Sequence, residues 1–286
     1  MKRLRGRTAV VTGAASGIGR AVALALGDRG CRLVLADVAE QGMAETARQL
    51  EARGVEVTTA VVDVAERAAV EALAQRVDTE LGGAQILVNN AGVTVDGGFA
   101  EQTWDDWDWV VGVNLWGVIH GCKAFLPQLL RADEAHIVNL SSMFGLAGIP
   151  AQVSYCTTKY AVRGFSEALY QELRYTRVGL TVVHPGGVNT NIVHAARVRH
   201  DDAHERFVEY FENRAMPPQQ AAARIVTAIE RGTPRLRIAK EAYVVDWLKR
   251  IAPVWGNHLV VALLLRMMGM KGELKRRSDE LVDRFR

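Results

Sequence analysis

The chain has few cysteines, no long apolar run and no excess of one charge. Its 286 residues include three cysteines, Cys31, Cys122 and Cys156, which are widely spaced and form no CxxC pair. They indicate neither a disulfide framework nor a zinc site, so reduced thiols in a cytoplasmic protein are the simplest account. A formal net charge of +3, with both signs mixed along the chain, gives no basic stripe and argues against nucleic acid as a partner.

Targeting and metal-binding patterns are scarce as well. The basic residues 1–7 are followed only by a short apolar strand, not by the apolar core of a signal peptide. His200 and His204 have the i, i+4 spacing that can bind a metal ion. Because no third ligand and no HExxH motif accompany them, we expect a solvated helix face there and no metal site.

The sequence does contain a regular alternation of short β-rich runs and longer helical runs. We predict strands at 8–11, 32–36, 55–62, 86–89, 136–140, 180–184 and 236–238. Helices are predicted at 18–28, 39–52, 67–80, 104–130, 152–176 and 218–230. This alternation is typical of an α/β fold in which helices cover both faces of a parallel sheet. With 49% apolar residues and no linker, residues 1–240 are predicted to form a single domain.

A glycine-rich loop, Gly13-x3-Gly17-x-Gly19, follows the first predicted strand and opens the first helix. Glycine is needed where the backbone turns tightly and approaches a phosphate, which then faces the N–H groups and the dipole of the helix. The spacing departs from GxGxxG, and a plain strand-to-helix turn is the alternative. We therefore expect this loop to bind the pyrophosphate of a dinucleotide.

Asp37 ends the second predicted strand, where a carboxylate can accept hydrogen bonds from both ribose hydroxyls of the adenosine and repel a 2′-phosphate. Ser16 and Val38 offer no cation to such a phosphate. The sequence therefore favours NAD over NADP. The alternative for Asp37 is an ordinary N-cap or turn aspartate.

Tyr155 and Lys159 lie four residues apart on a predicted helix, thirteen residues after Ser142. Residues at i and i+4 share one helix face, so the Lys159 ammonium can favour the ionised form of the Tyr155 phenol. An unperturbed tyrosine titrates near pH ~10, and bringing its pKa to working pH needs a shift of about three units, or roughly 4 kcal/mol. An ammonium together with a cationic nicotinamide ring can supply that stabilisation. Tyr155 then becomes a usable acid or base.

A series of short motifs runs in order through most of the chain. They are Thr12-Gly13-x3-Gly17-Ile18-Gly19, Asp63-Val64, Asn89-Asn90-Ala91-Gly92, Val113-Asn114-Leu115, Ile137-Val138-Asn139-Leu140-Ser141-Ser142, Tyr155-x3-Lys159 and Pro185-Gly186-Gly187-Val188-Asn189-Thr190. Together they resemble the motifs of the short-chain dehydrogenases/reductases. Thr158 stands where that family usually has serine, and both residues carry a hydroxyl.

The resemblance implies a Rossmann-like, doubly wound, seven-stranded parallel sheet and hydride exchange with a nicotinamide cofactor. It makes Tyr155 the acid/base and Lys159 the ligand of the nicotinamide ribose, which also lowers the pKa of Tyr155. Ser142, rather than Ser141, is expected to donate to the substrate oxygen. Asn114 is expected to hold a water that connects Lys159 to solvent, and its alternative role is to satisfy a backbone group. The expected cofactor contacts are Gly13, Ser16, Gly17, Ile18, Gly19, Asp37, Asp63, Val64, Asn90, Ala91, Gly92, Tyr155, Lys159, Pro185, Gly186, Val188 and Thr190.

The substrate is less well defined by the sequence. Apolar residues between Ser142 and Tyr155 predict an apolar pocket, and residues 190–216 lie where relatives carry a substrate lid. These pocket residues are Met143, Phe144, Leu146, Ile149 and Val153. We expect an NAD-dependent oxidoreductase that interconverts a bulky secondary alcohol, such as a hydroxysteroid or long-chain alcohol, and its ketone. The alternatives are loop packing for these residues, an NADP-dependent carbonyl reductase, a catalytically silent NAD-binding interaction protein, and a lyase or epimerase that uses NAD transiently.

Residues 241–286 are predicted to form an amphipathic helical extension. One apolar face has the spacing i, i+3, i+4, i+7, and a second apolar run covers 259–268, too short to span a membrane. The residues of the first face are Val244, Trp247, Leu248 and Ile251, and Pro253 follows them. We expect the extension to cover a neighbouring subunit of a homodimer or homotetramer, or the substrate mouth. The alternative is a membrane interface, with Lys249, Arg250, Arg266 and Lys271 toward the headgroups.

Overall fold

A computed structural model describes residues 1–198, 208–209, 215–267, 272, 275–276, 279 and 282–283. Within this part of the chain, seven strands form one parallel sheet in the order β3-β2-β1-β4-β6-β7-β9. The strands are β1 (Thr8–Thr12), β2 (Arg32–Asp37), β3 (Val57–Val61), β4 (Ile86–Asn89), β6 (Ala135–Leu140), β7 (Val178–Pro185) and β9 (Arg235–Ile238). The order reverses between β1 and β4, which opens a crevice at their carboxyl ends. The predicted Rossmann-like, doubly wound α/β sheet is confirmed.

The central strands are buried along their whole length. Every residue of β1, β4 and β6 is buried, as expected for parallel strands that are covered on both faces. The registers bring apolar side chains of three strands together, because Val10 pairs with both Val34 and Leu87. Continuous apolar runs therefore specify the middle of this sheet.

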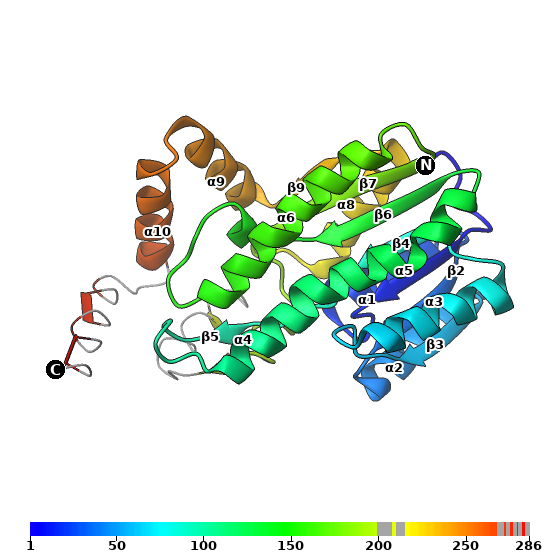
Figure 1. Cartoon of the computed structure of the whole chain (residues 1–286), viewed down its shortest axis with the longest axis horizontal. Coiled ribbons are helices and arrows are strands. Elements are labelled where there is room, and N and C mark those ends of the chain that lie inside the picture. Colours follow the sequence, from blue (N-terminus) through cyan, green and yellow to red (C-terminus); the bar gives the residue numbers. More distant parts are fainter. Residues whose placement is uncertain are drawn as a thin grey trace.

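Helices cover both faces of the sheet (Figure 1). On one face, α1 (Gly17–Gly27), α2 (Glu40–Glu51) and α8 (Pro218–Arg231) pack into one core cluster. On the other face, α3 (Arg67–Leu81), α5 (Gly117–Arg131) and α6 (Val153–Leu173) pack into a second cluster. The predicted strands and helices agree closely with these bounds.

A long helical run precedes β6. It consists of α4 (Trp104–Val111), one π-helical turn (Gly112–Trp116) and α5. By length and composition alone, Trp104–Arg131 is apolar enough to cross a membrane, but buried core helices of soluble proteins pass the same test. Val118, Phe125 and Leu129 of this run are buried against the sheet. We therefore interpret it as a core helix.

Two short strands beside the crevice were not predicted. β5 (Val95–Asp96) and β8 (Arg197–Val198) form a separate two-stranded parallel sheet, which ties the segment after Thr190 to the chain after β4. Two residues are too few to show a period in the sequence. The rest of the predicted lid, at 199–207 and 210–214, lies outside the described residues, as do His200 and His204.

The C-terminal extension contains α9 (Lys240–Ile251) and α10 (Trp255–Met267), at the end of the molecule away from the N-terminus (Figure 1). α9 buries Ala242, Val245 and Asp246. Most of the apolar face that we identified in the sequence is exposed instead, with Trp247 63% and Ile251 73% exposed. Met268 and Lys271 lie outside the described residues. The apolar residues that α9 buries within the chain are Ala242 and Val245, and the covering of the predicted face by a subunit or by the substrate mouth stays a prediction.

Candidate active site

A cavity of about 420 Å³ lies at the carboxyl ends of the central strands. The residues that line it are spread along the chain between positions 13 and 195. The predicted residues that line it are Gly13, Ser16, Gly17, Ile18, Asp37, Asp63, Val64, Asn90, Ala91, Gly92, Ser142, Tyr155, Lys159, Pro185, Gly186, Val188 and Thr190. Gly19 and Asn114 are predicted site residues that do not line it.

The glycine loop packs too closely for side chains. Gly13 and Gly17 have φ of +65° and +53°, in the left-handed region that glycine adopts readily. A Cβ atom on Gly19 would lie 2.0 Å from the Gly13 carbonyl oxygen, which explains why Gly19 matters without lining the cavity. Ser16 is extended and its side chain does not cap α1, which leaves the first N–H groups of the helix for an anion.

Backbone groups hold the Asp37 carboxylate at this loop. Its Oδ2 accepts a hydrogen bond from the Ala15 amide at 2.8 Å, and its Oδ1 accepts one from the Ala39 amide at 2.9 Å. Each carboxylate oxygen can accept a further hydrogen bond. Asp63, which is exposed, has one oxygen bonded to the Ala65 amide at 2.9 Å. Both carboxylates are thus oriented by the chain and keep acceptor capacity.

Thr12 and Asn90 join the ends of β1 and β4. The Thr12 hydroxyl accepts hydrogen bonds from the Asn90 and Ala91 amides, at 3.0 and 3.1 Å. The Asn90 side chain donates in return to the carbonyl oxygens of Thr12 and Gly13, at 3.0 and 3.1 Å. These bonds fix the two loops on either side of the crevice, and we did not include Thr12 among the site residues predicted from the sequence.

Tyr155, Lys159 and Ser142 meet at the end of β6. The Lys159 Nζ donates to the Leu140 carbonyl oxygen at 3.0 Å and lies 5.5 Å from the centre of the Tyr155 ring. The Ser142 Oγ accepts from the Phe144 amide at 3.1 Å, and the Ser142 side chain lies close enough to Tyr155 to lower the pKa of the phenol. The Ser141 hydroxyl instead donates to the Lys159 carbonyl oxygen at 2.8 Å. Of the two adjacent serines, Ser142 is therefore the one that contacts the tyrosine.

Burial acts on the pKa values of both titratable groups. It raises the pKa of Tyr155 to about 12, although the hydrogen bond from Ser142 lowers it, and it lowers the pKa of Lys159 to about 8. We predicted from the sequence that the ammonium would lower the pKa of Tyr155. In the protein by itself the pKa of Tyr155 is raised, because desolvation of the phenolate outweighs the lowering effect of Ser142.

Asn114 lies behind the cavity in the π-helical turn, and it is fully buried. Its Oδ1 accepts from the Val93 amide at 2.8 Å. Its Nδ2 donates to the Val93 carbonyl oxygen at 2.9 Å and to the Thr158 hydroxyl at 3.2 Å. The side chain therefore satisfies a backbone group, and it holds the chain that follows Gly92.

The part of the cavity near Tyr155 has an apolar wall. Phe144 meets the Tyr155 ring edge-on, with ring centres 6.1 Å apart. Other apolar residues that line the cavity include Val93, Trp109, Met143, Ile192 and Val193. Leu146, Ile149 and Val153, which we predicted for the pocket, do not line it. Ile192 and Val193 belong to the segment that we predicted as a lid, whereas Trp109 of α4 was not predicted to line the site.

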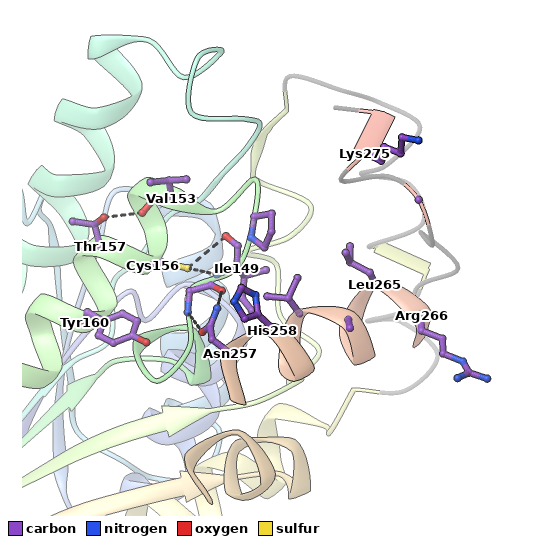
Figure 2. A pocket seen from close by; sticks show the side chains of 15 residues that line it. Ile149, Val153, Cys156, Thr157, Tyr160, Asn257, His258, Leu265, Arg266 and Lys275 are labelled. Carbon is purple, nitrogen blue, oxygen red and sulfur yellow. Dashed lines mark hydrogen bonds between the residues drawn. The ribbon is translucent and has the colours of Figure 1, made fainter. Parts of the chain in front are cut away.

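A second and larger cavity, of about 1120 Å³, lies between the start of α6, residues 148–150 and α10 (Figure 2). Its apolar lining includes Ile149, Pro150, Val153, Val261, Ala262 and Leu265. The Asn257 side chain exchanges two hydrogen bonds of 3.1 Å with the Gly148 backbone and so ties α10 to this loop. None of Ser142, Tyr155 and Lys159 lines this cavity, so we place the chemistry in the smaller one.

Comparison with known proteins agrees with this geometry. The family model described as short chain dehydrogenase matches residues 7–201. A Mycobacterium tuberculosis protein named SadH is 41% identical over 266 residues, which cover 92% of this chain and 96% of that protein.

Solved structures agree as well. A short chain dehydrogenase/reductase from Burkholderia phymatum in complex with NAD has 34% identity and a TM-score of 0.84, covering 89% of this chain and 96% of that one. A metagenomic short-chain oxidoreductase in complex with NADP has 28% identity and a TM-score of 0.69, covering 82% and 98%. The chain belongs to the short-chain dehydrogenase/reductase family of oxidoreductases, which use a nicotinamide cofactor.

Proposed function

We propose that the chain is an NAD-dependent dehydrogenase that interconverts a bulky apolar secondary alcohol and its ketone. The observation that carries the proposal is the arrangement of one crevice. Its apolar end holds Tyr155 with Ser142 and Lys159, and its other end holds the glycine loop and Asp37. A hydride acceptor and a proton acceptor can therefore face the same substrate carbon and oxygen.

Bound NAD supplies the hydride acceptor. Tyr155 takes the proton of the substrate hydroxyl during oxidation and returns it during reduction. Ser142 donates a hydrogen bond to the substrate oxygen, which orients it and stabilises the charge that develops. Lys159, with a pKa of about 8, is mostly protonated at neutral pH. Its charge, with that of an oxidised nicotinamide, opposes the effect of burial on the Tyr155 pKa.

The choice of NAD rests on the charge at Asp37. Hydrogen bonds from Ala15 and Ala39 hold its carboxylate at the glycine loop, where it would repel a 2′-phosphate. Arg20 of α1 is directed elsewhere, because its guanidinium donates to Thr46 and to the carbonyl oxygens of Ala15 and Gly42. An NADP-dependent carbonyl reductase is the second candidate, supported by the similarity to a structure that holds NADP.

The substrate class rests on the apolar wall of Phe144, Met143 and Trp109 near Tyr155. A sugar would leave its hydroxyls unpaired against these side chains, whereas a hydroxysteroid or long-chain alcohol would bury apolar surface. We also propose that residues 1–240 form the NAD-binding and catalytic domain, with a lid at about 190–216, and 241–286 an extension. We expect a cytoplasmic homodimer or homotetramer, in keeping with three buried free cysteines.

In this proposal Asn114 does not contact the substrate or the cofactor but acts by positioning its neighbours. Because its amide is bonded to Val93 and Thr158, we expect it to fix the loop over Lys159, and any water that it holds would use its backbone. Its replacement should therefore lower turnover through the position of Lys159.

A substrate panel tests the function. Hydroxysteroids, long-chain secondary alcohols and small diols are each assayed with NAD and with NADP for formation of the reduced cofactor. We expect turnover with NAD and one of the bulky apolar alcohols. A preference for NADP would favour the reductase, and tight NAD binding without any turnover would favour a silent binding protein. Product formation without release of NADH would indicate a lyase or epimerase.

A further inference from the structure

We infer that Asp246 is a positioning residue, which clamps the C-terminal extension onto the strand ends behind Ser142 and, through His184, holds the Ser142 backbone. The kinetic part of this inference rests on the proposed function. The structural part concerns only contacts among described residues, and it can be tested without a substrate.

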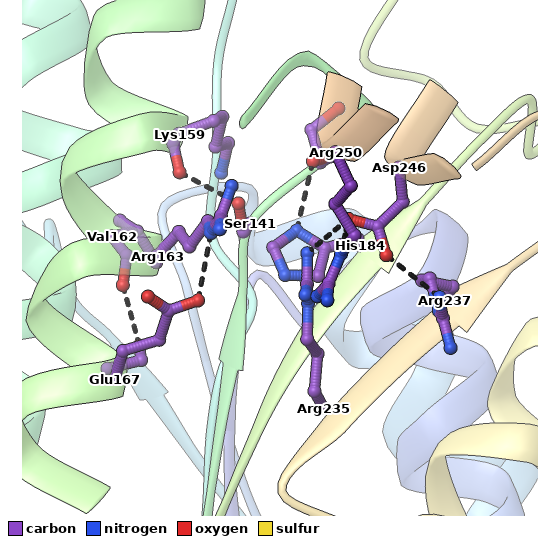
Figure 3. Close-up of polar contacts among 12 residues, drawn as sticks. Ser141, Lys159, Val162, Arg163, Glu167, His184, Arg235, Arg237, Asp246 and Arg250 are labelled. Atoms are coloured by element: carbon purple, nitrogen blue, oxygen red, sulfur yellow. Dashed lines mark hydrogen bonds and ion pairs between the residues drawn. The ribbon is translucent and has the colours of Figure 1, made fainter. Parts of the chain in front are cut away.

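Asp246 is a buried carboxylate surrounded by arginines (Figure 3). Its Oδ1 accepts from Arg235 at 2.7 Å and from Arg250 at 3.3 Å, and its Oδ2 accepts from Arg237 at 2.8 Å. Burial alone would raise the pKa of Asp246, but the arginines hold it below its usual range. Because Arg235 and Arg237 belong to β9, one side chain of α9 joins the extension to the edge of the sheet. Removing its charge would leave the guanidinium groups uncompensated.

The strand that Asp246 contacts, β9, pairs with β7, and β7 in turn contacts Ser142. Arg237 of β9 pairs in register with His184 of β7, which is fully buried. The His184 Nδ1 lies 3.2 Å from the Ser142 carbonyl oxygen. Because a carbonyl can only accept, Nδ1 must carry the proton, and burial keeps the ring neutral by lowering its pKa to about 4. His184 thus fixes the backbone of Ser142 from behind the site.

Apolar contacts also join α9 to the turn that follows Ser142. Ala242, Val245 and Leu248 of α9 pack in one cluster with Met143 and Phe144, which follow Ser142. The Phe144 amide donates to the Ser142 Oγ, and the Phe144 ring meets Tyr155. The turn after Ser142 is therefore held by the apolar contacts of α9, and the Ser142 carbonyl group is held by His184.

This arrangement predicts how a loosened clamp affects the reaction. If α9 separates from β9, the turn after Ser142 loses its apolar support, and the Ser142 hydroxyl can move relative to Tyr155. The glycine loop after β1 and Asp37 of β2 lie away from β9 in the sheet order, whereas Pro185 and Gly186, which also line the crevice, directly follow His184. Turnover should therefore fall by more than the affinity for NAD, most of whose predicted contacts lie outside β7 and β9.

Backbone hydrogen exchange on the full chain tests the clamp. In Asp246→Asn, which keeps the size and removes the charge, we expect the amides of residues 143–147 to exchange about tenfold faster. Amides of β4 should exchange as in the wild type, which excludes general destabilisation. Unchanged exchange at 143–147, or an equal rise over the whole sheet, would overturn the inference.

Two further comparisons separate positioning from a merely structural role. His184→Leu removes the donor to Ser142, whereas His184→Asn keeps an amide N–H. We expect turnover to fall about tenfold in Asp246→Asn and in His184→Leu, to recover in large part in His184→Asn, and the KM for NAD to stay within about twofold. Equal turnover in both His184 variants would reject the link to Ser142. If the wild type oxidises no alcohol while the exchange result holds, the proposed function fails and the clamp stands.

Discussion

The cofactor crevice and the C-terminal extension differ in what their apolar residues contact. In the crevice, the strands bury their apolar side chains on both faces, and the loops pack so closely that Gly19 has no room for a Cβ atom. In the extension, α9 and α10 bury one face each, while Trp247 and Trp255 remain 63% and 78% exposed. Among the described residues, the strands of the crevice are packed on both faces, whereas one apolar face of the extension has no covering. Substitutions in the two regions should therefore fail in different ways.

The largest effect is expected at the reacting proton. Tyr155→Phe keeps the ring and its contact with Phe144 but removes the transferable proton, so turnover should fall by about 10² or more while NAD still binds. Thr157→Ala, two residues along the same helix and facing the other cavity, is the matched control. Steady-state kinetics and an NAD titration measure both variants. Near wild-type turnover in Tyr155→Phe would reject Tyr155 as the acid/base.

The next effect concerns the packing of the glycine loop. Gly19→Ala places a Cβ where the Gly13 carbonyl oxygen and the Asn90 amide lie, so we expect a loss of about 2 kcal/mol in the free energy of unfolding and weaker NAD binding. Gly164→Ala, on α6 with open space around it, should not destabilise the protein, because alanine favours a helix. Urea unfolding compares the two. Equal stabilities would show that the loop is not as tightly packed as the contacts indicate.

The sheet should also show a dependence on pH. Burial lowers the pKa of His136 on β6 to about 3, below the value of about 6.5 in the unfolded chain. A base whose folded pKa is depressed stabilises the fold above the unfolded pKa, and this contribution is lost as the pH falls from 6.5 toward 3. Between pH 7 and 5, the wild type should lose about 2 kcal/mol that His136→Gln does not lose. Urea unfolding of both proteins at pH 7 and pH 5 measures this loss. An equal loss of unfolding free energy in the two proteins would contradict the assignment to His136.

Cofactor discrimination is expected to change less. Asp37→Ser removes the repulsion of a 2′-phosphate and the paired ribose bonds, so the ratio of kcat/KM for NAD to that for NADP should fall about tenfold. Asp63→Asn is the control, because this carboxylate also lines the crevice and its replacement should affect both cofactors alike. A wild type that already prefers NADP would show that Asp37 has been misread.

The two regions also differ in how far the sequence predicts them. The glycine loop and Asp37 could be assigned because a phosphate and a ribose demand particular backbone and side-chain chemistry just after particular strands. Periodicity found the helix of Trp247 and an apolar face that is mostly exposed in one chain, but it did not indicate that Ala242 and Val245 pack within the chain. No local sequence pattern predicts the contacts of Asp246 with Arg235 and Arg237. In the sequence, two arginines and a single aspartate are most simply read as exposed surface residues, and only the fold brings them together.

The smallest effect on the fold is expected at the exposed face of the extension. The same test asks what covers this face, which is the main difference between the extension and the crevice. Deleting residues 241–286 would also remove Ala242 and Val245 from the core that supports Phe144, so surface substitutions are the cleaner test. The double variant Trp247→Ser and Trp255→Ser should lose less than about 0.5 kcal/mol in stability and keep turnover within about twofold, because both rings are mostly exposed. If a neighbouring subunit covers this face, gel filtration should show a smaller species for the variant than for the wild type. An unchanged elution volume, together with loss of binding to anionic vesicles in co-sedimentation, would instead assign the face to a membrane surface.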